Sequence, residues 1–219
     1  PSLIGVLIIL FLIKEVGTPI LKGVTAKFEW HKTNASFRAF LLISFIFAVG
    51  NSSDAFLVLR AQNLGMSVGL IIFTYVLFNV TNAIFSIPAG MVADKIGYKR
   101  VMAAGFVLFA LVYLGFGIIN DSIYVWVLFP LYGVFMALTD GVSKAYISKL
   151  VPHEVSASAF GIYQTAMGVA TLMASILAGV LWSSFGPRTP FYFGASMAIM
   201  AEIVFFLLSK RIKLLEQPG

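Results

Sequence analysis

Three carboxylates interrupt long apolar stretches of the chain: Asp54, Asp140 and Glu202. An ionisable side chain in such surroundings is costly and is a candidate for function by default. A carboxyl group there can carry a proton, because desolvation favours its neutral form, or it can bind a cationic group. Asn51 lies about one helical turn before Asp54 and adds an amide to the same stretch. We therefore take Asn51, Asp54, Asp140 and Glu202 as candidate substrate or proton site residues.

Each carboxylate also has a structural interpretation that the sequence leaves open. Asp54 is either a proton or substrate group or an interfacial carboxylate paired with Arg60, although six residues along a helix turn by about 600° and do not share a face. Asp140 and Lys144 have the i, i+4 spacing of an ion pair, which favours a structural role. Glu202 also fits a packed, protonated carboxyl in the middle of the last apolar stretch.

Residue sets for catalysis or metal binding are missing from the sequence. It contains no Cys, His31 and His153 lack the spacing of metal ligands, and neither a phosphate-binding loop nor a Ser-His-Asp set is recognisable. We expect no enzymatic activity, no cofactor and no metal site.

Composition indicates an integral membrane protein. Of the 219 residues, 60% are apolar and 11% are charged, and the mean hydropathy is +0.97. Soluble domains are about 45–50% apolar and about 25% charged. The net charge of +6 is therefore assigned to loops that face the cytoplasm, and no nucleic acid partner is expected.

Apolar segments divide the chain into predicted membrane spans. Each approaches the roughly 20 residues that a helical span needs, and none shows the alternation of a β-strand. The six segments are 39–59, 68–89, 101–119, 123–147, 157–182 and 190–209. The sequence thus predicts an all-α membrane protein with a six-helix bundle over 39–209.

The two ends of the sequence are assigned separately. Residues 1–13 are predicted to be a truncated transmembrane helix, because their apolar run rises only about 16 Å, roughly half a bilayer. Residues 14–38 read as a basic linker, and residues 210–219 as a tail.

Basic residues set the predicted orientation. With the linker inside, every Lys and Arg except Arg60 and Arg188 lies on the inner side, which is 13 of 15. Because cytoplasmic loops carry the excess of Lys and Arg, we expect a cytoplasmic linker and a cytoplasmic C-terminus.

A glycine- and charge-bearing loop joins the second and third of these segments. It reads Gly90-Met-Val-Ala-Asp94-Lys95-Ile-Gly97-Tyr-Lys99-Arg100. The glycines permit a tight turn and close helix approach, and an anion such as Asp94 is favoured at a helix N-terminus, for which residues 157–160 are the best candidate. A generic positive-inside turn would explain the basic residues but not the spacing of Gly and Asp.

This loop resembles the signature loop of the major facilitator superfamily at all six specifying positions. The resemblance implies that the chain runs from the end of helix six to helix twelve of a transporter, with the loop between helices eight and nine. It also implies two inverted three-helix repeats. An internal echo agrees with this, because Gly90 and Gly97 align with Gly179 and Gly186.

The resemblance also implies a function. We expect a secondary active transporter that works by alternating access, with proton-coupled efflux of a small molecule as the leading hypothesis. A metabolite uptake symporter and a non-transporting membrane scaffold are the alternatives. The expected partners are a small-molecule substrate, protons, the lipid bilayer and a missing N-terminal half, and the expected location is a bacterial inner membrane.

The orientation is testable by labelling single cysteines in the full-length protein. A Cys placed at Asn120 or Pro187 is expected to react with an impermeant thiol reagent added outside the cell, whereas a Cys at Tyr98 is not. The reverse pattern would overturn the orientation and the numbering of the helices.

Overall fold

The described part of the chain is entirely helical. The computed structural model describes residues 34–215, with side chains described to residue 208, so the predicted helix over 1–13 and most of the linker lie outside it. The helices are α2 (Ala35–Gly50), α3 (Ala55–Asn63), α4 (Val68–Ile96), α5 (Tyr98–Ile118), η2 (Ser122–Tyr124), α6 (Val125–Leu150), α7 (His153–Phe185) and α8 (Thr189–Leu215).

Six helical segments of this region are long and apolar enough to cross a membrane, which confirms the predicted all-α fold. The outer bounds differ from the prediction at both ends. α2 begins at Ala35 because the Asn34 side chain accepts a hydrogen bond from Ser36 N at 2.9 Å and caps the helix. α8 continues to Leu215, since charged residues end a span without ending a helix.

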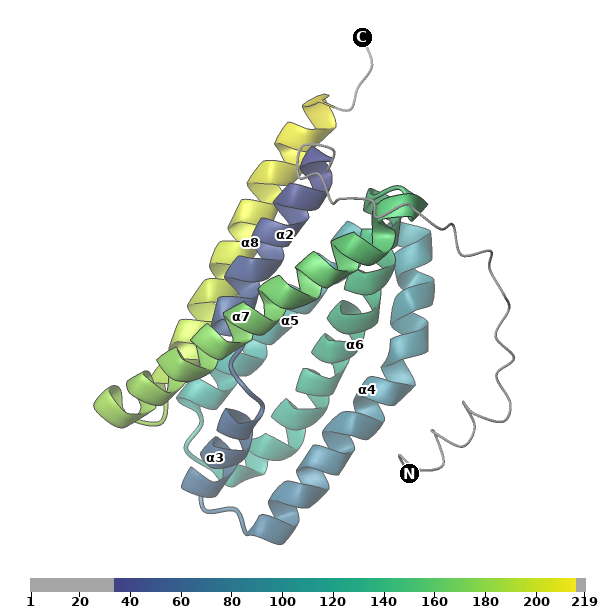
Figure 1. Ribbon diagram of the computed structural model, residues 1–219. Helices are drawn as coiled ribbons and strands as arrows, with labels where there is room; N and C mark the ends of the chain where they lie inside the picture. The colour runs from purple at the N-terminus through teal and green to yellow at the C-terminus, as the bar shows by residue number, and fades with distance from the viewer. Residues whose placement is uncertain (1–33, 216–219) are drawn as a thin grey trace, which may run out of the picture.

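The first span covers Ala35–Asn63, in agreement with the segment predicted over 39–59, but it is not one continuous helix. α2 ends at Gly50, and α3 begins at Ala55. The four residues between them include the candidates Asn51 and Asp54. Figure 1 shows the chain leaving α2 and turning into the short α3 at the far end of the bundle.

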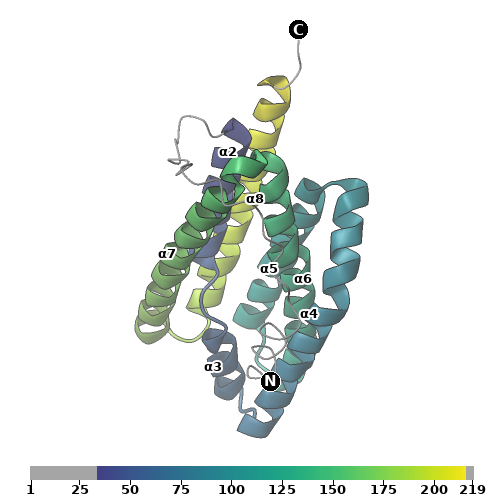
Figure 2. The same cartoon turned by 45° about the vertical axis from the view of Figure 1, so that its right-hand side comes forward.

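The helices pack as neighbouring pairs around a shared core. α2 runs along α8, α4 packs most extensively against α6, and α5 lies between α6 and α8 (Figure 1). Seen after rotation, α7 lies on the α2 side of the bundle and α4 on the other (Figure 2). Few residues of the α4 and α7 spans are buried, 17% in each against 56% for α5, so much of their surface is left for other contacts.

Stacked aromatic rings fill the space between α2, α5 and α6. The ring centroids of Phe47 and Phe106 are 4.2 Å apart, and those of Phe109 and Tyr113 are 3.9 Å apart. Phe135 of α6 lies 4.9 Å from Phe109. Such pairs contribute about 0.5–1.5 kcal/mol beyond the area they bury.

Glycine allows two close helix contacts. A Cβ added at Gly133 of α6 would lie 2.5 Å from the backbone oxygen of Phe78 on α4. A Cβ at Gly194 of α8 would lie 2.6 Å from the oxygen of Gly50 on α2. In lipid, small residues of this kind let backbones approach closely.

The glycines of the signature loop differ in their roles. Gly97 ends α4 with a φ of +98°, which confirms the expected tight turn, and Gly186 ends α7 with a φ of +94°. The two positions that the internal echo aligns thus share one backbone geometry, while the inverted repeat itself stays a prediction. Gly90 has no atom within 4 Å of its added Cβ, so it makes no close helix approach among the described residues.

Gly133→Ala should lower the thermal unfolding midpoint of the purified full-length protein. The methyl group meets backbone that has no flexible side chain to yield, and overpacking of this kind costs about 1–3 kcal/mol. Gly141→Ala is the matched control, because it lies on the same helix with nothing within 4 Å. Alanine there should leave stability unchanged or raise it by about 0.5–1 kcal/mol. Equal midpoints for the two variants would contradict the close α4–α6 contact.

Candidate functional site

The interruption of the first span places Asp54 at the start of α3. Asp54 occupies the N-cap position, and its backbone oxygen accepts from Leu57 N at 3.0 Å. Its side chain makes no capping hydrogen bond, so its carboxylate is left for other partners. The side chain is half-buried.

A buried tyrosine of α6 contacts this carboxylate. The hydroxyl of Tyr132, a residue with 1% exposure, donates to Asp54 Oδ1 at 2.8 Å and lies 3.5 Å from Asn51 Oδ1. Asn51 and Asp54, grouped by the sequence, therefore meet at one hydroxyl. The described structure brings together a carboxylate, an amide and a phenol at the break.

Next to this group, a cavity of about 190 Å³ opens between α2, α5, α6 and α7. Asn51 and Asp140 line it, together with Gln164 of α7. The rest of the lining is mostly aromatic, methionine and hydroxyl side chains. The first and fourth spans contribute Asn51 and Asp140 to this lining, whereas Asp54 is connected to the cavity through Tyr132 and Asn51 rather than lining it.

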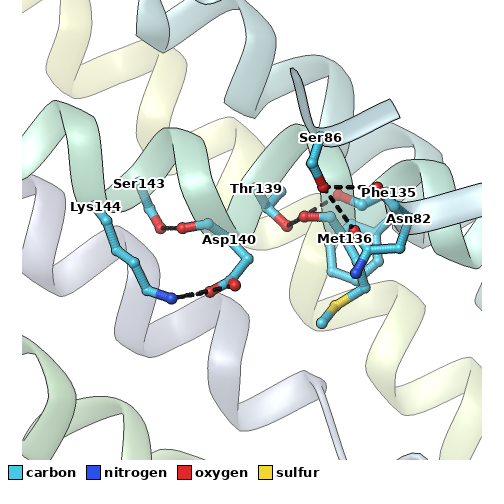
Figure 3. Close-up of polar contacts among 8 residues, drawn as sticks. All are labelled: Asn82, Ser86, Phe135, Met136, Thr139, Asp140, Ser143 and Lys144. Carbon is cyan, nitrogen blue, oxygen red and sulfur yellow. Dashed lines mark hydrogen bonds and ion pairs between the residues drawn. The ribbon is translucent and has the colours of Figure 1, made fainter. Parts of the chain in front are cut away.

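Asp140 forms the ion pair that its spacing indicated. Lys144 Nζ lies 2.9 Å from Asp140 Oδ1, and the two side chains are 47% and 60% exposed, respectively. Figure 3 shows the pair on one side of α6, beside Ser143, whose hydroxyl donates to the backbone oxygen of Asp140. Exposed i, i+4 pairs contribute only about 0.3–0.5 kcal/mol, so this carboxylate remains accessible to a competing cation.

The polar residues of α4 largely bond to their own helix. Ser86 Oγ donates to the backbone oxygen of Asn82 at 2.6 Å, and Asn79 Nδ2 donates to that of Tyr75 at 2.8 Å. Figure 3 places Asn82 and Ser86 beside Met136 of α6, close to the region of Asp140. They are neighbours of the cavity rather than members of its lining.

Arg60 does not pair with Asp54 in the described structure. It is 2% exposed, and its guanidinium donates to the oxygens of Phe116 at 3.0 Å and Ile119 at 2.8 Å, and to Asn63 Oδ1. These two backbone oxygens belong to the end of α5, where helix carbonyls lack partners. The expected absence of pairing is confirmed, and Arg60 serves as a cap.

Glu202 lies apart from the other candidates. It lines a separate groove between α5 and α8, together with Val107 and Ile203. Its side chain is half-buried, and among the described residues none donates to its Oε2 atom. The structure therefore does not bring Glu202 together with Asn51, Asp54 and Asp140.

The signature loop lies at the end of the bundle opposite α3 (Figure 1). The Tyr98 hydroxyl donates to Asp94, and Lys149 Nζ lies 3.8 Å from Asp94 Oδ1 and 4.5 Å from the centre of the Tyr98 ring. These polar contacts of Asp94 thus join α4, α5 and α6. They do not include the predicted helix N-terminus near 157–160, which lies inside α7 because that helix begins at His153. Lys95 and Arg100 are exposed, and Lys99 is partly so.

Sequence reasoning missed Tyr132, Tyr163 and the hydroxyls of the cavity. Tyr132 stands in an apolar run of α6 with no polar neighbour that would single it out. Aromatic residues in such runs are usually core residues. Only the packing of α6 against the break shows that its hydroxyl has a carboxylate partner.

Comparison with known proteins gives a consistent family. The sequence model of the Major Facilitator Superfamily matches residues 37–218. The chain is 35% identical, over 92% of its length and 52% of the relative's, to an uncharacterised MFS-type transporter of Methanocaldococcus jannaschii. It is 30% identical to the multi-drug resistance efflux pump PmrA of Streptococcus pneumoniae, over 57% of this chain and 31% of that protein.

The chain spans about half the length of its M. jannaschii relative. An uncharacterised transporter of Buchnera aphidicola is 25% identical over 70% of the chain and 38% of its own length. The signature loop, the six apolar helices and the family match over 37–218 agree with one another. The chain is an integral membrane protein that belongs to the major facilitator superfamily of transporters, not an enzyme.

Proposed function

We propose that this chain is the C-terminal half of a secondary transporter that exports a small amphiphilic molecule in exchange for protons. The observation that carries the proposal is the contact of Asp54 with Tyr132 at a helix break beside the cavity. Interrupted helices inside a membrane are tolerated where they line a site, and many transporters bind substrate and coupling ions there.

Asp54 is the proposed proton carrier. Its half-buried position disfavours the charged form, whereas the hydrogen bond from Tyr132 favours it. These opposing influences suit a group that must bind and release a proton in each cycle. Because Tyr132 also lies beside Asn51 at the cavity edge, a change in the protonation of Asp54 can affect the substrate through the Tyr132 hydroxyl.

The lining of the cavity supports an amphiphilic substrate. Met102, Met136 and Met167 contribute flexible thioether side chains, which adapt to irregular apolar shapes. Asp140 adds a carboxylate at one side. The similarity to a multi-drug efflux pump points in the same direction. The volume of about 190 Å³ is smaller than the roughly 300–1,000 Å³ of a full ligand site, as expected for one side of a site shared by two halves.

A second half is proposed to pack against α4 and α7. These helices bury the smallest share of their spans within the described bundle. Gly161, Gly168 and Gly179 of α7 have no atom within 4 Å of an added Cβ, so their surface is open to a closely packed helix. The chain covers only 52% of the length of its M. jannaschii relative, which supports a partner half.

Asp94, Tyr98 and Lys149 are proposed to form a cytoplasmic latch. The three residues join the ends of α4, α5 and α6. Because the side chains of Lys149 and Asp94 are 59% and 65% exposed, the ion pair between them contributes at most about 1 kcal/mol to stability. Such an amount changes an equilibrium between two states about fivefold, which is sufficient to affect a transport cycle.

Asp94→Asn is expected to reduce the flux of the full-length transporter severalfold while leaving membrane insertion intact. Lys149→Gln should have a similar effect, and the double variant should be no worse than either single variant, because both remove the same contact. Flux into vesicles provides the measurement, and Arg38→Gln, which changes an exposed basic residue outside the loop, is the control for general loss of positive charge. Additive losses would show that Asp94 acts through other partners.

Asp54→Asn is expected to abolish proton-driven flux while retaining substrate exchange. Exchange needs the binding site but not a titrating group, and Asn keeps an oxygen that can accept from Tyr132. The two modes are compared in proteoliposomes with and without a pH gradient, with Asp121→Asn in the loop at η2 as the matched control.

Four outcomes of that comparison would argue against the proposal. Full loss of substrate binding would make Asp54 a substrate ligand rather than a proton carrier. Unchanged pH-dependent flux would exclude it from both roles. Accumulation of substrate with the gradient, rather than extrusion, would favour uptake, and the absence of any flux in the wild-type protein would favour a scaffold.

A further inference from the structure

Glu202 stands alone in a groove that faces away from the central cavity. The groove has a volume of about 240 Å³ between α5 and α8. Among the described residues that line it, Glu202 is the only ionisable one and the others are all apolar. Val107, Leu111 and Ile203 on its walls are 47%, 60% and 56% exposed. The groove is therefore open on the outer side of the bundle, where lipid chains would lie.

One oxygen of the Glu202 carboxylate lacks a hydrogen-bond partner among the described residues. Its Oε2 atom is buried and accepts no hydrogen bond from the described residues. An unpaired charge in an apolar environment is costly, so the group is either protonated or paired with a donor that comes from outside the chain. The groove itself fixes the chemistry of such a donor: one positive charge on an apolar body.

The depth of Glu202 narrows the choice further. It lies eight residues before Lys210, the first charged residue that follows it in the chain, which is roughly 12 Å of helix rise. A lipid headgroup at the interface is out of reach at that depth. A hydrated inorganic cation would need several oxygen ligands, and the groove offers one carboxylate.

We propose that the α5–α8 groove is a binding site for a lipophilic tertiary amine, which enters from the bilayer as the neutral base and takes up the proton of the Glu202 carboxyl to form an ion pair. The resulting ammonium has a single N–H donor, which the Glu202 carboxylate in the groove can accept. Its apolar substituents replace lipid against Val107, Leu111 and Ile203. This site differs from the central cavity, and its occupation does not depend on the proposed transport function.

Phe106 separates the two sites. It lines both the cavity and the groove, is 3% exposed, and stacks on Phe47 at 4.2 Å. An amine in the groove thus stays one aromatic ring away from the central site, and binding at the two sites can be measured separately.

The first test measures saturable binding of radiolabelled N,N-dimethyldodecylamine to the full-length protein in phosphatidylcholine nanodiscs. Glu202→Gln is expected to weaken binding at least tenfold, because the charge and the strong acceptor are lost together. Val107→Trp, which fills the mouth of the groove, should do the same with Glu202 intact. Ile118→Trp is the matched control: it lies on the same face of α5, 61% exposed and outside the groove, and should bind like the wild type.

A second measurement needs no substitution. A hydrophobic carbodiimide adds to a protonated, lipid-accessible carboxyl, whose proton moves to the reagent nitrogen as its oxygen bonds the central carbon. Mass mapping should find Glu202 modified. The extent of modification should fall at least threefold when dimethyldodecylamine is present, whereas dodecanol should leave it unchanged. Wild-type binding in Glu202→Gln, or loss of the saturable component in Asp54→Asn instead, would overturn the proposal. Equal protection of Glu202 by dodecanol would do the same, since it needs no cation.

Discussion

A helix that stops inside a membrane leaves backbone donors and acceptors without water to satisfy them. The break between α2 and α3 meets this constraint with nearby atoms. Asn51 N donates to Ala48 O at 3.1 Å, Ser53 N to Ser175 Oγ of α7 at 3.3 Å, and Ala55 N to Ser53 Oγ at 3.3 Å. The break is therefore held by its own neighbouring residues and by Ser175 of α7, and the position of Asp54 follows from that support.

The same constraint explains the buried arginine. Arg60 follows the break by one and a half turns, and its guanidinium bonds the oxygens of Phe116 and Ile119 where α5 ends. A buried charge with several good acceptors is tolerated, whereas an unpaired one is not. Because Arg60 bonds to the end of α5, Asp54 has no cationic partner among the described residues. Its side-chain donor there is the neutral hydroxyl of Tyr132.

Sequence patterns predicted the spans and the turn but not the break. Long apolar runs and the glycine-bearing loop report directly on lipid and on backbone geometry, so the six spans and the turn at Gly97 were accessible. Proline is the usual sign of an interrupted helix, yet Pro88 and Pro130 lie inside continuous helices here. The interruption falls instead at Asn51–Asp54, where short polar side chains offer the backbone alternative hydrogen bonds.

Partners contributed by distant segments were beyond sequence reasoning for the same reason. Tyr132 is 78 residues from Asp54, and its hydroxyl acquires a role only because the fold places α6 beside the break.

The position of Glu202 shows why a carboxylate inside a span is not enough to define a central site. α8 has one side against α2 and another against α5, and a difference of a few residues decides which side a group occupies. Gly194 lies against Gly50 of α2, whereas Glu202, eight residues later, lies at the outer edge of α5. Eight residues turn a helix by about 800°, which is 80° past two full turns. That rotation places Glu202 away from the α2 contact, in the groove between α5 and α8. Phe106 separates this groove from the central cavity.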